Sequence, residues 1–147
     1  MKTRTGFLSL ILVLGMGCLL LSGCGDGRPS RVKVSGNVTI DGKPVTGGIQ
    51  FFPSAGGRRG GGTIKDGRYT AMMYTPDDGL PTGDYRIAII SNQDVNELTV
   101  RWLIPEKYAD IETSQLTASI TEETDAMNFE VTWEGDEHGE PYEIKQR

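Results

Sequence analysis

Short runs of alternating apolar and polar residues, each ended by glycine, proline or aspartate, constrain most strongly how this chain folds. In residues 31–40 the apolar side chains share one parity and polar or small residues occupy the other. These apolar residues are Val32, Val34, Val38 and Ile40. A period of two is typical of a strand with one buried face. No segment keeps a period of 3.6 residues over three turns, so we expect an all-β fold.

Turn-forming residues separate the runs. Asp66-Gly67 lies between the strand-like segments 62–65 and 68–74 and is the strongest hairpin signal in the chain. Short strands spaced about 8–15 residues apart predict a seven-stranded antiparallel β-sandwich. Its expected interior residues are Val32, Val34, Val38, Ile40, Ile49, Phe51, Tyr69, Ile87, Ile89, Leu116, Ile120, Phe129 and Val131.

Residues 91–114 are the least regular part of the chain. Residues 96–104 fit either a strand or a short helix, and residues 105–108 fit one helical turn after Pro105.

The composition excludes several classes of function. With 147 residues the chain is about one domain long, and its formal net charge of −5 disfavours nucleic acid as a partner. One histidine and two cysteines supply few ligands for a transition metal. We therefore expect no metal and no cofactor.

The first residues have the pattern of an export signal. Lys2 and Arg4 precede an apolar run over residues 7–21. That run is about 15 residues long, short of the roughly 20 that span a bilayer. A basic start followed by a short apolar run and small residues is typical of a secretory signal peptide. An uncleaved membrane anchor is the alternative interpretation.

The end of that run, Leu21-Ser22-Gly23-Cys24, resembles the bacterial lipobox. The resemblance implies cleavage between Gly23 and Cys24, a diacylglyceryl group on the Cys24 thiol, and an acyl chain such as palmitate on the new amine. Two or three acyl chains suffice for stable anchoring. Gly25, and not an aspartate, follows the cysteine, which by analogy with enteric bacteria favours the outer membrane. We expect an exported protein that is anchored in the cell envelope.

The chain is expected to have four parts: a signal peptide over residues 1–23, the lipidated cysteine and a polar tether over 24–30, a β-sandwich domain over 31–133, and a polar, disordered tail over 134–147. Cys18 would leave with the signal and Cys24 would carry lipid, so no disulfide is expected.

Four motifs in order resemble carboxypeptidase regulatory-like, or transthyretin-like, domains. They are Val34-Ser35-Gly36-Asn37-Val38-Thr39-Ile40-Asp41-Gly42-Lys43-Pro44-Val45, Asp66-Gly67-Arg68-Tyr69, Pro81-Thr82-Gly83-Asp84-Tyr85-Arg86-Ile87, and Ile104-Pro105-Glu106-Lys107-Tyr108 followed by Thr113-Ser114-Gln115-Leu116-Thr117. The last resembles a segment of small planctomycete lipoproteins. The resemblance covers about residues 32–131. It implies a prealbumin-like sandwich, of the broader immunoglobulin-like type, that serves as an accessory, adhesion or substrate-presenting module without catalysis.

Related transthyretin-like enzymes that hydrolyse a urate product carry a His/Arg/Ser set and a Tyr-Arg-Gly-Ser end. Here His138 lies in the expected tail and the chain ends Ile144-Lys145-Gln146-Arg147. The resemblance therefore does not imply that hydrolase activity for this chain.

The glycine-rich segment 56–62 contains Arg58 and Arg59. Glycine N–H groups and two guanidinium groups could bind an anion such as a carboxylate or a sulfate. A mobile linker between strands is the alternative, and it is favoured because loops of this composition are usually mobile.

Trp102, Tyr108 and Trp133 could form an aromatic platform on which a sugar stacks. Burial of these rings in the core is the favoured alternative, because large aromatic side chains are mostly buried.

Two acidic groups could bind a cation. Asp77-Asp78 with Asp84 could hold calcium, although the spacing matches no 12-residue calcium loop and fits turn formation better. His138 stands near Asp136, Glu137 and Glu140 in the tail, where a lone histidine is rarely a metal ligand.

The expected function is a non-enzymatic interaction or structural module whose partner is an unknown envelope protein or glycan. A glycan-binding or anion-binding module is the alternative. A small hydrolase is the weakest hypothesis, because the mature chain has no Ser/His/Asp or Cys/His set.

Overall fold

The computed structural model describes residues 27–146, so Cys24 and the expected signal peptide lie outside the described residues. The described chain is all-β and contains no α-helix. Its strands are β1 (Ser35–Ile40), β2 (Lys43–Pro44), β3 (Gly47–Pro53), β4 (Gly60–Ile64), β5 (Arg68–Thr70), β6 (Gly83–Ile90), β7 (Asn92–Asn96), β8 (Thr99–Trp102), β9 (Leu116–Ile120), β10 (Phe129–Val131) and β11 (Tyr142–Lys145). A 3₁₀ turn, η1, covers Glu106–Ala109.

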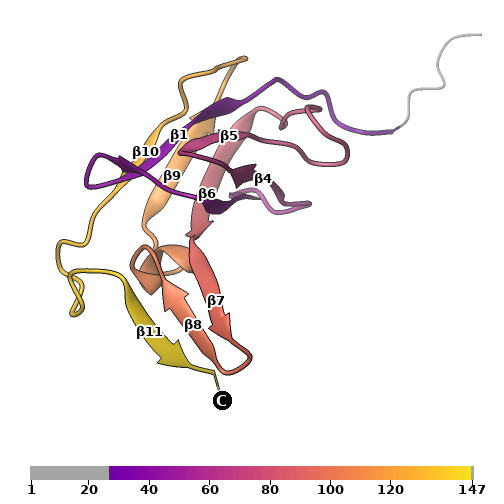
Figure 1. Ribbon diagram of the computed structural model, residues 1–147. Helices are drawn as coiled ribbons and strands as arrows, with labels where there is room; N and C mark the ends of the chain where they lie inside the picture. Colours follow the sequence, from indigo (N-terminus) through magenta and orange to yellow (C-terminus); the bar gives the residue numbers. More distant parts are fainter. Residues whose placement is uncertain (1–26, 147) are drawn as a thin grey trace, which may run out of the picture.

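The strands form three sheets, and antiparallel pairing dominates (Figure 1). One sheet has the order β4-β3-β6-β9, and every neighbouring pair in it is antiparallel. A second has the order β10-β1-β2, with β5 also pairing with β1; its β1–β10 pair is parallel. The third, β11-β8-β7, lies at the end of the molecule away from the N-terminal segment. The predicted all-β, mainly antiparallel class is confirmed.

An aromatic cluster joins the first two sheets. The centroid of the Phe51 ring on β3 lies 6.0 Å from the ring centroids of Tyr69 on β5 and Tyr85 on β6. It lies 6.3 Å from the ring centroid of Phe129 on β10. The Tyr69 hydroxyl donates to the Met127 carbonyl at 2.6 Å and the Tyr85 hydroxyl to the Pro81 carbonyl at 2.7 Å. Burial raises the pKa of both phenols. The rings therefore add apolar area to the core without leaving a buried hydroxyl unpaired.

The predicted interior is buried at all but two of its positions. Val32 and Leu116 are half-buried and contact the edge of the core. Val32 precedes β1 and makes only an isolated bridge with Leu80, and Leu116 begins the edge strand β9. Strand ends at a sheet edge are covered from fewer sides, which explains both differences.

Two Asp-Gly turns, the predicted one at Asp66-Gly67 and a second at Asp41-Gly42, have the backbone geometry of a tight hairpin. Asp66 and Gly67 have φ values of 48° and 81°, and Asp41 and Gly42 have 46° and 76°. Two successive positive φ values are typical of the type I′ turn, which aspartate and glycine tolerate best. The first turn joins β4 to β5 and the second joins β1 to β2.

The third sheet differs from the sequence prediction. Residues 134–147 were expected to form a disordered polar tail, but Tyr142–Lys145 form β11, which pairs antiparallel with β8. The ambiguous residues 96–104 contain β8, a strand, and the predicted helical turn after Pro105 is confirmed as η1. The pattern in β11 was missed because only Tyr142 and Ile144 alternate there, too few residues for a periodicity.

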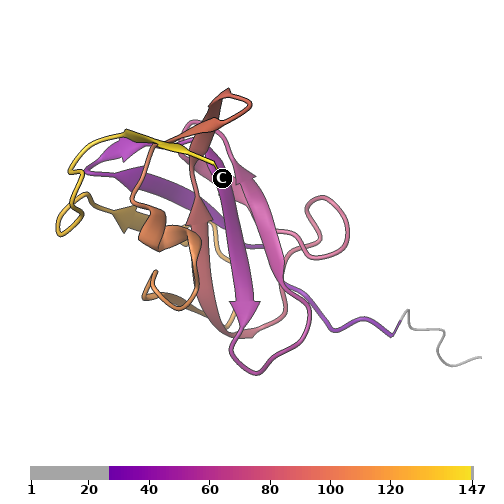
Figure 2. The ribbon, with the colours of Figure 1, turned by 90° about the horizontal axis from the view of Figure 1, so that it is seen from below.

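The N-terminal segment and the third sheet lie at opposite ends of the molecule. Figure 2 shows β11, in yellow, on the side away from residues 27–34, in agreement with Figure 1. The segment 71–82 runs beside the N-terminal segment, where Val32 and Leu80 exchange two backbone hydrogen bonds of 2.8 and 3.0 Å. That end contains the candidate site.

Candidate functional site

The aromatic side chains considered for a sugar platform are buried or half-buried, as the favoured interpretation predicts. Trp102 is 8% exposed and Tyr108 is 7% exposed, and the Tyr108 hydroxyl donates to the Thr132 carbonyl at 3.3 Å. Trp133 is half-buried and packs edge-on against Tyr142, with centroids 6.3 Å apart. Stacking on a sugar needs an open aromatic face. The buried rings support the alternative interpretation, in which they fill the core.

The glycine-rich segment does not form one anion-binding loop. Gly60 begins strand β4, and the Gly61 N–H already donates to the Met72 carbonyl at 2.9 Å. The two arginines also diverge. The Arg59 guanidinium lies over Phe52, 5.8 Å from the ring centroid, whereas Arg58 turns toward Tyr74. The two guanidinium groups therefore lie against different aromatic rings, Tyr74 and Phe52.

Arg58 instead joins two arginines from the N-terminal segment. The guanidinium carbons of Arg28 and Arg58 each lie 4.7 Å from the centroid of the Tyr74 ring, and that of Arg31 lies 5.1 Å from it. We call these four residues the arginine cluster. Attraction between guanidinium groups and the ring's π-electrons holds the arginines there. The Arg58 Nε–H also donates to the Met73 carbonyl at 3.1 Å.

Asp78 organises the backbone that carries Tyr74. Its carboxylate accepts hydrogen bonds from the N–H groups of Met73 at 2.8 Å, Tyr74 at 3.1 Å and Thr75 at 3.2 Å. It also lies 3.4 Å from the Nε of Arg31. Burial by itself would raise the pKa of Asp78, but the three N–H donors and the charge of Arg31 outweigh it and lower the pKa below its ordinary value.

We expect Asp78→Asn to lower the free energy of unfolding by about 1–2 kcal/mol at pH 7, because charge-assisted hydrogen bonds to the loop are lost. Since folding lowers the pKa of Asp78, its contribution is present above the ordinary value of 3.8 and is lost as the pH falls below it. Urea unfolding at pH 7 and pH 3 measures both effects, and the difference between variant and wild type should shrink at pH 3.

Asp77→Asn is the matched control, because Asp77 is exposed and its φ of 61° suits asparagine. It should change the free energy of unfolding by less than about 0.5 kcal/mol. Equal losses in the two variants would show that Asp78 does not brace this loop.

A cavity of about 290 Å³ adjoins the arginine cluster. Arg58 and Tyr74 line it together with Pro29 from the N-terminal segment, Pro53 at the end of β3 and Tyr85 on β6. Asp84, which precedes Tyr85 on β6, is a further lining residue and is acidic. The cavity opens beside exposed guanidinium groups and is therefore suited to an anionic group attached to a less polar body.

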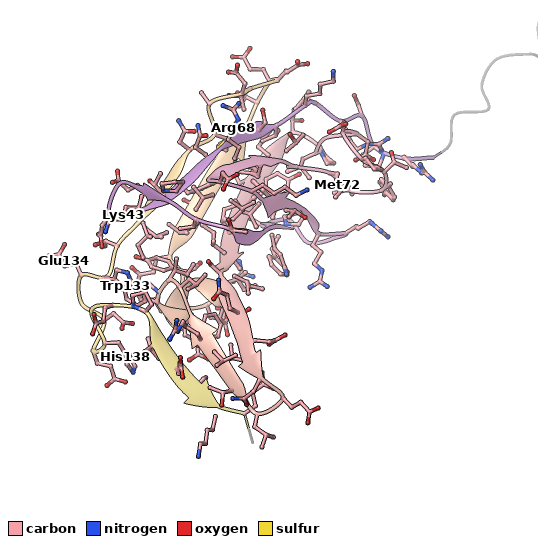
Figure 3. The ribbon with its side chains drawn as sticks, viewed as in Figure 1. Lys43, Arg68, Met72, Trp133, Glu134 and His138 are labelled. Atoms are coloured by element: carbon pink, nitrogen blue, oxygen red, sulfur yellow. The ribbon has the colours of Figure 1, made fainter. Side chains whose placement is uncertain are left out.

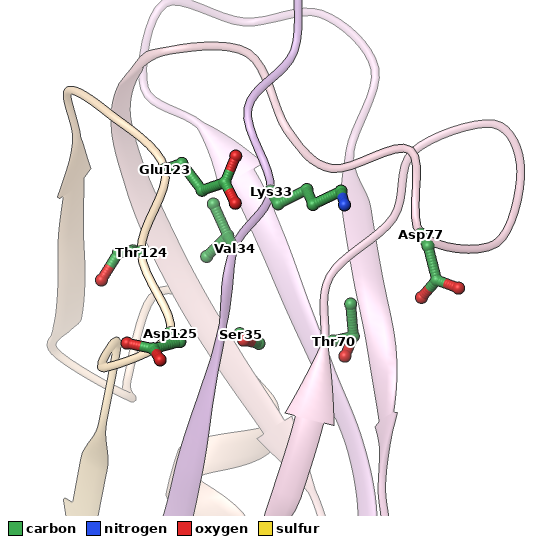
Figure 4. Close-up of a pocket in the computed structure, with 8 residues that line it drawn as sticks. All are labelled: Lys33, Val34, Ser35, Thr70, Asp77, Glu123, Thr124 and Asp125. Atoms are coloured by element: carbon green, nitrogen blue, oxygen red, sulfur yellow. The ribbon is translucent and has the colours of Figure 1, made fainter.

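A larger depression lies at the start of β1 and holds no converging catalytic set (Figure 4). It has a volume of about 590 Å³, and its lining includes Lys33, Thr70, Asp77, Glu123 and Asp125. Figure 4 shows Asp77 on one side of the chain that leads into β1 and Asp125 on the other. The acidic side chains of this depression are therefore divided between the two sides of that segment.

His138 interacts with its own neighbours. Its ring stacks on Tyr142, with centroids 3.4 Å apart, and its Nδ1 lies 3.3 Å from the Asp136 carboxylate. Figure 3 shows Trp133, Glu134 and His138 on the same side of the molecule, far from Met72. Across residues 27–146, no group of three or more histidine, cysteine, aspartate or glutamate side chains is placed to hold a metal ion. The Asp77, Asp78 and Asp84 carboxylates are not gathered into a calcium site either.

Comparison of the chain with known protein families, with curated proteins and with solved structures finds no match. The resemblance to carboxypeptidase regulatory-like domains therefore stays a prediction from the motifs. In the part of the chain that the structure describes, no helix is long and apolar enough to cross a membrane.

The arginine cluster could not be found from the sequence. Arg28 lies in the expected polar tether, Arg31 lies at the start of the expected β-sandwich domain, and Tyr74 is distant from both along the chain. Only the pairing of the N-terminal segment with residues around Leu80 brings them together. No local spacing signals this contact.

Proposed function

We propose that this protein is a non-enzymatic, lipid-anchored module of the cell envelope, exported through its N-terminal signal and held at the membrane by lipid on Cys24. Its anchor would lie in the outer membrane and its partner would be another envelope component. The lipobox at Leu21-Ser22-Gly23-Cys24 is the observation that carries this proposal. The cysteine lies just outside the described residues.

The arrangement of the two ends supports an anchored orientation. The described chain begins at the end with the arginine cluster, and the third sheet lies at the opposite end (Figure 1). A lipid on Cys24 would therefore hold the arginine cluster near the membrane and turn the β7–β8 hairpin away from it. Val95 and Leu98 on that hairpin are 47% and 65% exposed.

We further propose that seven of the strands form a sandwich of the transthyretin-like type. The two layers would be β10-β1-β5 and β4-β3-β6-β9. Support comes from the single buried core to which both layers contribute, including Val38, Phe51 and Ile87. On this proposal β2 and the third sheet are additions to the sandwich.

The surroundings of the polar side chains support a role without catalysis. The buried hydroxyls of Ser91 and Ser114 donate to the carbonyls of Thr46 and Ile87, at 2.7 and 2.5 Å. His138 has neither a serine nor a cysteine among its contacts in residues 27–146. A nucleophile needs a base within hydrogen-bond reach, so these groups serve structure.

We expect Cys24→Ser to move the protein out of the membrane fraction or to leave a larger, uncleaved precursor, because lipid supplies nearly all of the membrane affinity at about 0.8 kcal/mol per buried CH₂. Fractionation of cells and immunoblotting measure both outcomes. Cys18→Ser is the matched control, since Cys18 lies within the signal, and it should remain in the membrane at wild-type size.

Retention of Cys24→Ser in the membrane at the size of the mature wild type would contradict the proposed anchor. The non-enzymatic part has its own test. Turnover of an ester, peptide or glycoside by the purified protein that is abolished by one substitution within residues 31–133 would contradict it.

A further inference from the structure

The geometry points to the arginine cluster and its adjoining cavity as a binding site for a phosphate group. The inference deepens the proposed function, because the lipid anchor would place this site against the phosphates of an anionic bilayer. The site differs from the loop that the sequence suggested. It uses Arg58 without Arg59 and adds Arg28 and Arg31 from the N-terminal segment.

The first argument is the concentration of positive charge. Three guanidinium groups lie within 5.1 Å of one ring centroid, so three positive charges are gathered around a single side chain, and like charges repel one another. Asp78 pairs with Arg31, but its carboxylate also serves three backbone N–H groups. Within residues 27–146, Arg58 forms no ion pair, and its Nε is used by the Met73 carbonyl. An incoming anion would relieve this repulsion.

The second argument is the chemistry of the donors. A guanidinium group presents a planar fork of N–H donors that fits two oxygens of a phosphate. Contact with the Tyr74 ring holds the forks of Arg31 and Arg58 in place, so little side-chain entropy is lost when an anion binds. Asp84 also lines the cavity, and its negative charge leaves Arg58 as the lining side chain suited to a phosphate.

The third argument is the shape of the site. The cavity of about 290 Å³ is roughly ten times the ~30 Å³ that one water molecule occupies in the liquid. It can therefore hold a phosphate together with part of the group that carries it. Pro29, Pro53 and Tyr85 supply apolar surface beyond the arginines, as the glycerol of a lipid headgroup would require.

The fourth argument is the short length of chain between the lipidated cysteine and the arginine cluster. Cys24 and Arg28 are four positions apart in the sequence, which is at most about 14 Å of extended chain. A protein anchored through Cys24 therefore keeps the arginine cluster at the level of the headgroups. Basic residues so close to an anionic surface are attracted to it. A free phosphate ion is the other source of the same chemistry.

The test is hydrogen–deuterium exchange of the full lipidated protein in vesicles. One preparation contains phosphatidylcholine alone and another adds phosphatidylglycerol, whose phosphate has no cation beside it. We expect exchange at the N–H groups of Met73, Tyr74 and Thr75 to slow about threefold in the anionic vesicles, the effect of a ligand at twice its dissociation constant. A third arm adds inorganic phosphate to the neutral vesicles.

Slower exchange in the anionic vesicles alone assigns the site to lipid headgroups, and slower exchange with inorganic phosphate assigns it to the free ion. Either result supports the inference. Unchanged exchange in both arms overturns it. The phosphate arm does not depend on the anchor, and an intact mass of the same sample reports lipidation of Cys24. Failure of the proposed anchor is therefore distinguishable from failure of this site.

Arg58→Gln should abolish the slowing, because Arg58 is exposed and its loss removes a donor without opening the core. The matched control is Arg101→Gln on β8, which makes the same change in net charge at the far end of the molecule, where Arg101 pairs with Glu143. It should retain the threefold effect. An equal loss in both variants would show that only net charge matters and would overturn the inference.

Discussion

Phe51→Ala is expected to lower the free energy of unfolding by about 3–5 kcal/mol, the usual cost of deleting a buried phenylalanine ring. Phe51 is 0% exposed, and its ring contacts Tyr69, Tyr85 and Phe129. The substitution therefore removes the ring that joins the first two sheets and leaves a cavity between them. Urea denaturation followed by circular dichroism measures the loss.

Phe52→Ala is the control for Phe51→Ala. Phe52 is the next residue of β3, so its side chain points to the opposite face of the sheet, where it is half-buried under Arg59. We expect it to cost less than about 1.5 kcal/mol, because part of its surface is already in water. Equal losses for the two variants would contradict a core shared by both sheets.

Gly36→Ala is expected to cost about 3 kcal/mol or more, because the added methyl group meets backbone and not a movable side chain. A Cβ at Gly36 in β1 would overlap the carbonyl group of Met127. Strand β1 and the segment that contains Met127 cannot simply move apart, because hydrogen bonds join them. Met127 N–H donates to the Ser35 carbonyl at 3.1 Å, and the Asn37 N–H donates to the Asn128 side chain at 2.9 Å. Thermal unfolding measures the effect.

Gly48→Ala in β3 is the matched control for Gly36→Ala. The nearest atom to its added Cβ is the Gly62 carbonyl oxygen at 3.9 Å, an ordinary contact distance. Alanine also restricts the unfolded chain more than glycine does, so we expect a change within about 1 kcal/mol, in the stabilising direction. If Gly36→Ala were as stable as Gly48→Ala, the attachment of residues 124–128 along β1 would be wrong.

Local rules predicted much of the fold. The alternation of Val34, Val38 and Ile40 identified a strand and its buried face, and Asp66-Gly67 identified a hairpin turn. Both signals depend on a few neighbouring residues. They predict a strand or a tight turn well because these structures also form over a few neighbouring residues. The same reasoning missed β11, because its partner β8 is remote in sequence and its own alternation is short.

Contacts between segments that are distant in the sequence determine where some side chains lie, and local sequence patterns do not predict such contacts. Arg58 and Arg59 are neighbours in the chain, yet one lies over Tyr74 and the other over Phe52. Their proximity in sequence therefore did not predict a shared contact. Burial of Trp102 and Tyr108, by contrast, was the favoured prediction, and both side chains are buried.

The intact mass of the protein extracted from membranes tests the central claim most directly. The proposal predicts a chain that begins at Cys24 and carries a diacylglyceryl group on its thiol and an acyl chain on its amine, with no species that retains Met1. A chain with Met1 present and an unmodified Cys24 thiol would contradict the proposal, because the N-terminal apolar run would then be an uncleaved anchor.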